Sequence, residues 1–146
     1  MTIVRSRSML WAVSLGLAIV ASPARAEDRA QASLSLDLNA VEQIEQACRL
    51  VFVATNATGK SIGEMTLETV LFDGSGKVTR FALFDFKALP DGKTRVRQFD
   101  LPDTQCSAVG RILINGAASC DGEGLTGAEC IDLLEVKSST NTEISG

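Results

Sequence analysis

Short runs in which apolar and polar residues alternate constrain this chain more than any other feature. In SLSLDL at 33–38 the three leucines fall on one face of an extended strand and the polar residues on the other. Turn-forming residues separate the runs, as in Asp73-Gly74-Ser75-Gly76 and Leu89-Pro90-Asp91-Gly92. The runs expected to form strands are 34–38, 48–56, 64–73, 78–89, 93–101, 107–116 and 131–137. About seven short strands at this spacing predict an all-β fold, an antiparallel β-sandwich.

Three other segments lack this alternation. Residues 40–47 are expected to form a helical turn or a loop, and residues 121–129 a loop rich in glycine and acidic residues. The polar stretch at 139–146 predicts a flexible C-terminal tail. The domain organisation expected from the sequence is a signal peptide at 1–26, a β-sandwich domain at 27–138 and the tail.

The N-terminus has the three parts of a secretory signal peptide. Arg5 and Arg7 precede an apolar stretch at 9–21, and Ala24-Arg25-Ala26 follows a proline as a cleavage site. The apolar stretch is shorter than the roughly 20 residues that a spanning helix needs. We therefore expect a periplasmic or secreted protein with no membrane span after signal cleavage.

Charge excludes some partners for the exported part. Without the three arginines of residues 1–26, 11 of the 14 basic residues remain against 18 acidic residues, a net charge of −7. Such a surface disfavours nucleic acid and anionic membranes, since both are polyanions. The sequence indicates no metal or other cofactor.

All four cysteines lie in the exported part, at Cys48, Cys106, Cys120 and Cys130. Because they form no C-x-x-C pair and the chain has no histidine, two disulfides are expected rather than a metal site. Four cysteines allow three pairings. The strands at 48–56 and 107–116 are expected to run in the same direction, which brings Cys48 and Cys106 to one end. Cys120 and Cys130 then face each other across the loop at 121–129.

The stretch N56-A-T-G-K-S-I-G-E-M-T-L-E-T-V-L-F-D-G-S-G-K-V78 resembles the FxLYD-type domains of exported bacterial proteins. The matching residues are Asn56, Leu71, Phe72, Asp73, Gly76, Lys77, Val78, Pro90, Gly92 and Phe99. Thr69 and Phe72 replace the phenylalanine and tyrosine of that motif, Asp91 separates its proline from its glycine, and the cysteines are unlike that family. The resemblance covers roughly residues 32–116 and implies an immunoglobulin-like sandwich, in a family without an assigned function.

No catalytic constellation is evident in the sequence. A serine triad has no histidine, and paired cysteines leave no thiolate. The acidic residues stand mainly at turns or on alternating strand positions. Asp121, Glu123 and Glu129 offer oxygen ligands for calcium but lack the spacing of an EF-hand, so a solvated loop is the alternative. Asn56-Ala57-Thr58 is a formal glycosylation sequon that also fits a turn.

Phenylalanine is concentrated in one predicted strand, at Phe81, Phe84 and Phe86. Alternation places Phe81 and Leu83 on one face and the other two rings, with Ala82, on the opposite face. Either both faces are covered, or one face is exposed for binding.

Arginines are concentrated in the next strand, at Arg95 and Arg97, on the same face as Phe99 and Leu101. Either a bulge near Gln98 turns them outward, or their stems pack at an edge of the sandwich with the charged groups in water. The functional interpretation is a small basic patch, with Arg80 and Arg111, for an acidic ligand or partner. We predict a binding site made of Phe81, Phe84, Phe86, Arg95 and Arg97.

The function expected from these features is that of a non-enzymatic binding or assembly module of the bacterial envelope. Its partner is expected to be another protein or a second copy of the chain. The alternatives are a hydrolase that uses carboxylates and a purely structural envelope subunit.

Overall fold

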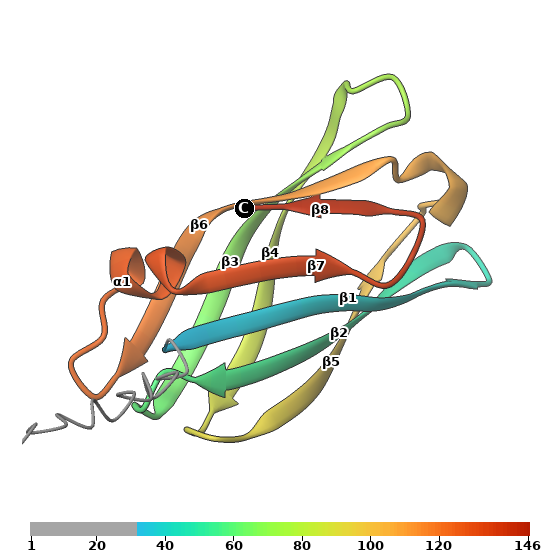
Figure 1. Cartoon of the computed structure of the whole chain (residues 1–146). Coiled ribbons are helices and arrows are strands. Elements are labelled where there is room, and N and C mark those ends of the chain that lie inside the picture. Colours follow the sequence, from blue (N-terminus) through green and yellow to red (C-terminus); the bar gives the residue numbers. More distant parts are fainter. Residues whose placement is uncertain (1–31) are drawn as a thin grey trace, which may run out of the picture.

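Two four-stranded sheets pack face to face in the computed structural model, which describes residues 32–146 (Figure 1). The predicted signal peptide lies outside the described residues. The strands are β1 (Ser33–Ile44), β2 (Ala47–Ala57), β3 (Ile62–Phe72), β4 (Val78–Leu89), β5 (Thr94–Leu101), β6 (Arg111–Gly122), β7 (Leu134–Ser138) and β8 (Glu143–Ser145). A 3-10 turn at Cys106–Ala108 and the helix α1 (Gly127–Asp132) complete the elements. The predicted all-β sandwich is confirmed, with eight strands.

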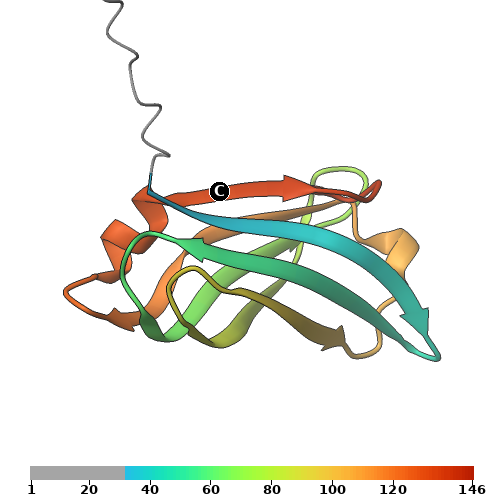
Figure 2. The same ribbon diagram turned by 60° about the horizontal axis from the view of Figure 1, so that its bottom comes forward.

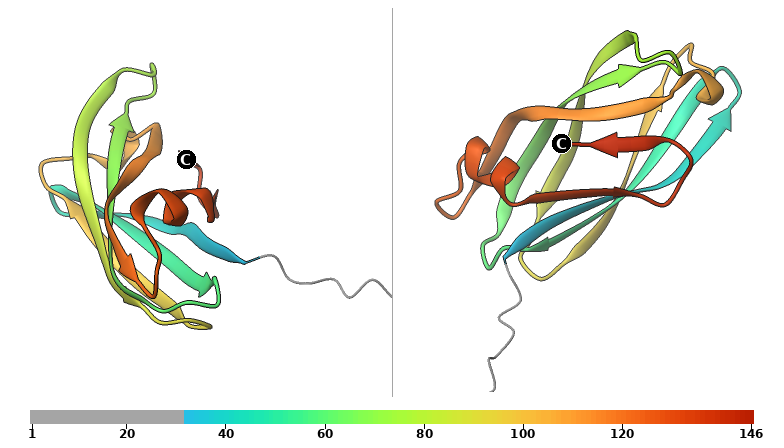
Figure 3. Two further views of the ribbon diagram at one scale, coloured as in Figure 1. Left: turned by 90° about the vertical axis from the view of Figure 1, so that its left-hand side faces the viewer. Right: turned by 45° about the horizontal axis from the view of Figure 1, so that its top comes forward.

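The strand order is β5-β2-β1-β7 in one sheet and β4-β3-β6-β8 in the other. Pairing is antiparallel except at the C-terminus, where β7 runs parallel to β1 and β8 parallel to β6. Figure 2 shows the first sheet lying over the second. On one side β7 and β8 contact each other, and on the other side the edge strands β4 and β5 do so (Figure 3).

The structure corrects several of the expected segments. Residues 40–44 continue β1 after a bulge between Leu38 and Ala40 and pair with residues 47–51 of β2. Glu45 and Gln46 form the turn between the two strands. Part of the loop expected at 121–129 is helical, because Thr126 caps α1 in a reciprocal capping box with Glu129. The strand expected at 107–116 begins only at Arg111 and extends to Gly122.

The C-terminal residues 139–146 are not a flexible tail. Glu143–Ser145 forms β8 and pairs with the start of β6. Thr142 is buried, and Ile144 packs against the core. Pairing with a strand far away in the sequence overrides the polar composition of this segment.

The core lies between the sheets and is centred on Phe52 of β2. Phe84 and Phe86 of β4 and Phe99 of β5 surround its ring at centroid distances of 5.6–5.9 Å. Alternation accounts for this burial, because Leu34, Leu36 and Leu38 of β1 and alternate residues of β2, from Cys48 to Ala54, face inward.

Both expected disulfides form. Cys48–Cys106 joins the start of β2 to the 3-10 turn, and Cys120–Cys130 joins β6 to α1. Two disulfides fit a location outside the cytoplasm. Across residues 32–146, no helix has the length and apolar character needed to cross a membrane.

Candidate functional site

The two faces of β4 differ sharply in exposure. Phe84 and Phe86 point into the core and are 3% and 0% exposed, whereas Phe81 and Leu83 point outward and are 74% and 65% exposed. Phe84 and Phe86 were predicted as binding residues, and the structure corrects this: both are core residues, since their face of β4 meets the opposite sheet. Phe81 is the aromatic residue of the predicted set that lies on the surface.

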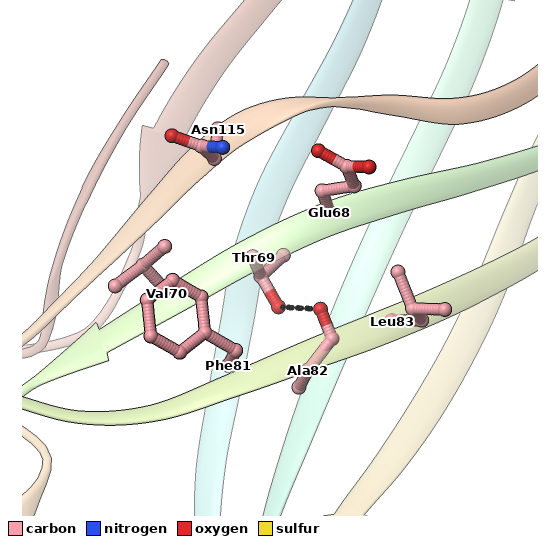
Figure 4. Close-up of a pocket in the computed structure, with 7 residues that line it drawn as sticks. All are labelled: Glu68, Thr69, Val70, Phe81, Ala82, Leu83 and Asn115. Carbon is pink, nitrogen blue, oxygen red and sulfur yellow. Dashed lines mark hydrogen bonds between the residues drawn. The ribbon is translucent and has the colours of Figure 1, made fainter.

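The outward residues of β4 line a shallow depression of about 380 Å³ on the second sheet (Figure 4). Strand register positions its walls, because Phe81 lies beside Val70 of β3 and Leu83 beside Glu68. The Thr69 hydroxyl crosses between the strands and donates a hydrogen bond to the Ala82 carbonyl at 2.9 Å. The lining residues are Glu68, Thr69, Val70, Phe81, Ala82, Leu83 and Asn115.

We call Val70, Phe81 and Leu83 the β4 patch. In Figure 4 the Phe81 ring lies over Val70, which is only 5% exposed although it belongs to the outer face. The patch has a carboxylate, Glu68, and an amide, Asn115, at its rim. This arrangement suits an apolar side chain of an extended segment whose polar groups meet the rim.

Charges around the β4 patch are distributed unevenly along the strands. Near the C-terminal end of β4, Asp85 forms an ion pair with Lys87. The hydrogen bond from the Lys87 ammonium and a second one from the Lys87 backbone amide lower the pKa of Asp85 below its usual value. Near the N-terminal end of β4, Arg111 of β6 stacks on the Phe72 ring, 4.1 Å from its centre.

The two arginines of β5 have a structural role at the edge of the sandwich. Arg97 Nε donates to the carbonyl of Phe86 at 2.7 Å, and Arg97 Nη2 to that of Ala88 at 3.3 Å. Arg95 bonds only to the carbonyl of the preceding residue. The register between β2 and β5 is continuous from Thr94 to Leu101, so no bulge lies near Gln98 and the edge-packing alternative holds.

The arginines therefore do not form one basic patch. Arg97 points to the C-terminal half of β4, while Arg80 donates to the carbonyl of Pro102 at 3.0 Å. Arg111 is held on Phe72 by a cation–π contact. Each guanidinium has a separate local partner.

The sequence analysis missed other apolar surface residues. Val70 belongs to the run Val70-Leu71-Phe72, which is apolar on both faces of β3, and this signal resembles the one in β4. Val78 and Val96 are also exposed, at 41% and 55%; Val96 lies on the outer face of the first sheet, beside Val53.

Glu129, a candidate calcium ligand, and Asn56, the asparagine of the glycosylation sequon, both have structural roles. Glu129 caps α1 by accepting hydrogen bonds from the amide and hydroxyl of Thr126. Among residues 32–146, no three aspartate, glutamate, cysteine or histidine side chains converge as a metal site. Asn56 of the sequon is fully buried, and its amide nitrogen donates to two carbonyls, which fits the turn interpretation.

A second hollow, about 480 Å³, lies at the end of the sandwich near the 3-10 turn. Its charged residues are Asp73, Arg80 and Asp103. Asp73 accepts hydrogen bonds from the hydroxyl and amide of Ser75 and the amide of Lys77, which lower its pKa. These contacts stabilise the turn after β3.

Together, the fold and the patch define a class of protein: a small, disulfide-bonded β-sandwich that exposes apolar side chains on an edge strand. The structure is similar to that of IrmA from Escherichia coli, with a TM-score of 0.59 and 17% sequence identity over 73% of this chain and 92% of IrmA. At this identity the likeness shows the fold alone.

The sequence comparisons found no relatives. No family model matches the chain, and no curated protein matches it. The resemblance to FxLYD-type domains therefore stays a prediction.

Proposed function

We propose that this protein is a non-enzymatic binding or assembly module of the bacterial envelope, acting in the periplasm or after secretion. The observation that carries the proposal is the β4 patch, in which Phe81 and Leu83 are 74% and 65% exposed on neighbouring outward positions. Clustered apolar side chains of this size on a surface mark sites of protein association.

The energy available at the patch is sufficient for a protein contact. Full burial of one Phe or Leu side chain contributes roughly 1.5–3 kcal/mol. Two such residues provide roughly 3–6 kcal/mol before the costs of association are subtracted. A partner therefore needs further polar contacts, which the rim residues Glu68 and Asn115 are placed to provide.

The local roles of the charged side chains favour binding over catalysis. Among residues 32–146, the carboxylates with lowered pKa values are Asp73, Asp85, Asp100 and Glu129, and each is held by a turn, an ion pair or a helix cap. A carboxylate hydrolase instead needs a proton donor whose pKa is raised.

The test is capture of partners in the native envelope with a tagged protein, chemical cross-linking and mass spectrometry. The wild type should retain a defined partner that the Phe81→Ser/Leu83→Ser variant loses. Val96→Ser is the control, because Val96 is an exposed apolar residue, 55% exposed, on the outer face of the other sheet. Equal capture by all three proteins would contradict the proposal.

Export is tested by the intact mass of the same purified protein. Cleavage after Ala26 gives a chain that begins at Glu27. An uncleaved chain held in the membrane would contradict the proposed location.

A further inference from the structure

The chain contains a single Asn-Gly pair, Asn115-Gly116, and the structure places it at the rim of the β4 patch. Asn115 is exposed, and Gly116 lies opposite Glu68 of β3. The pairing of β3 with β6 passes from Glu68–Gly116 to Thr69–Ile114, so Asn115 is the extra residue of a bulge. Its side chain is therefore open to solvent, and no residue of β3 stands opposite it.

The Asn115 amide is not hydrogen-bonded to the other residues that line the depression. Among the residues drawn in Figure 4, the hydrogen bond joins the Thr69 hydroxyl to the Ala82 carbonyl. Asn56 is the opposite case, because it is buried and its side chain takes part in four hydrogen bonds. Within this depression, no such bond prevents the Asn115 side chain from turning toward its own backbone.

An asparagine followed by glycine can react with the next peptide group, because glycine has no Cβ to hinder the approach. The backbone nitrogen of Gly116 attacks Cγ of Asn115 and forms a nitrogen–carbon bond. The bond from Cγ to the side-chain nitrogen breaks, and ammonia leaves with the proton of the peptide nitrogen. Water then opens the cyclic imide at either carbonyl, which leaves aspartate or isoaspartate.

We infer that Asn115 is a site of spontaneous deamidation in the folded protein, and that the reaction adds a negative charge to the rim of the β4 patch. The product is ionised at neutral pH, beside the Glu68 carboxylate. A group that donates and accepts hydrogen bonds is thereby replaced by one that only accepts. The consequence for binding rests on the proposed function, whereas the modification itself does not.

The variant Gly116→Ala isolates the reaction. A Cβ at this position would meet only Oε2 of Glu68, at 3.5 Å, which is an ordinary contact, so the fold should be retained. The added methyl group hinders the approach of the nitrogen to Cγ. We expect deamidation to slow by about tenfold or more, which is at least about 1.4 kcal/mol in activation free energy.

Asn39 is an internal control within the same chain. It is exposed, and the pairing of β1 with β2 skips it between Leu38 and Ala40, as the pairing of β3 with β6 skips Asn115. Because alanine follows it in place of glycine, Asn39 should remain an amide over the same period.

Peptide mapping of the mature, oxidised protein after ageing in mildly alkaline buffer measures the reaction. Trypsin releases residues 112–137, in which Asn115 is the only asparagine, and deamidation raises the mass by the difference between an acid and an amide. The wild type should lose the Asn115 amide progressively, and faster at higher pH, because the deprotonated peptide nitrogen is the attacking group. Circular dichroism and intact disulfides establish that the aged protein is folded.

Two results would overturn the inference. One is retention of the Asn115 amide in the folded wild type. The other is an equal rate in Gly116→Ala, which would exclude attack by the Gly116 nitrogen.

Envelope capture tests the consequence for binding. Asn115→Asp, which has the charge of the product, should weaken capture of the partner by up to about tenfold, the equivalent of one lost hydrogen bond. Capture equal to that of the wild type would refute the effect on binding. If the wild type itself retains no partner, the proposed function fails, and the peptide map still decides whether Asn115 is modified.

Discussion

Among single residues, Asn56 has the most hydrogen bonds to lose. It is fully buried at the end of β2, and its amide nitrogen donates to the carbonyls of Lys60 and Leu89 at 2.8 and 2.7 Å. Its side-chain oxygen accepts from the amide and hydroxyl of Thr58. One amide thus joins the loop after β2 to the end of β4.

Asn56→Asp should therefore destabilise the protein strongly while changing little in shape. The carboxylate would face two carbonyl oxygens in place of the lost N–H donors, and we expect a cost of about 3 kcal/mol or more in the free energy of unfolding. Urea denaturation at pH 7 measures it. The exposed Asn115→Asp is the control and should change stability by less than about 0.5 kcal/mol. Similar values for both variants would contradict the role of Asn56.

The lowered pKa of Asp73 should make the stability of the fold depend on pH. The Ser75 hydroxyl, the backbone amides of Lys77 and Ser75 and the nearby Lys77 charge hold its pKa below the ordinary aspartate value. A carboxyl group with a depressed pKa stabilises the fold above about pH 4, and this contribution is lost as the pH falls through the folded-state pKa.

We expect stability to be nearly constant from pH 5 to 7, since the chain has no histidine, and to fall below about pH 4. Asp73→Asn should be less stable than the wild type at pH 7 and nearly equal to it at pH 2–3. Denaturation midpoints at both pH values measure this. An unchanged difference between the two proteins would show that ionisation of Asp73 does not contribute.

Among the elements, β4 and β5 are joined by side-chain contacts along the C-terminal half of β4. These strands belong to different sheets, so backbone pairing does not join them. The planar guanidinium of Arg97 joins them instead, by donating to the carbonyls of Phe86 and Ala88 at the edge of β4.

Arg97→Lys should loosen this contact while retaining the charge. An ammonium group cannot reproduce the two-point geometry, and we expect a loss of about 1–2 kcal/mol. Hydrogen–deuterium exchange should increase at residues 84–89 and 94–99. Arg95→Lys is the control, because Arg95 bonds only to the adjacent Thr94 carbonyl. Unchanged exchange in the Arg97 variant would contradict the proposed role.

In the molecule as a whole, the two disulfides close loops of very different length. Cys48–Cys106 spans 58 residues and holds the 3-10 turn at the start of β2, whereas Cys120–Cys130 spans 10 residues and holds α1 against β6. In the chain-entropy model a longer closed loop restricts the unfolded chain more.

Replacing each pair by alanine should therefore give unequal losses, of roughly 4 kcal/mol for Cys48–Cys106 and roughly 2–3 kcal/mol for Cys120–Cys130. Chemical denaturation of both double variants measures the difference. A greater loss from the shorter bridge would show that contacts of α1 outweigh the entropy of the closed loop.

How well the sequence predicts a segment depends on whether its conformation is set by local residues or by pairing with another part of the chain. Residues 34–38 and 64–72 alternate in their own sequence, so both were correctly predicted to lie in strands. Residues 40–44 were not, because their conformation depends on pairing with residues 47–51 of β2. The same reason explains β8, which is held by residues 111–113 of β6.

By itself, the sequence determined the strand-rich fold and the two faces of β4, because alternation and turns are local properties. The disulfide pairs were predicted correctly from the expected strand directions, which depend on the topology and not on local sequence. It did not determine which face of β4 is buried. Phe81 and Leu83 are as apolar as Phe84 and Phe86, and a lone strand has no inside. Only packing against β2 and β5 made one face core and left the other as surface.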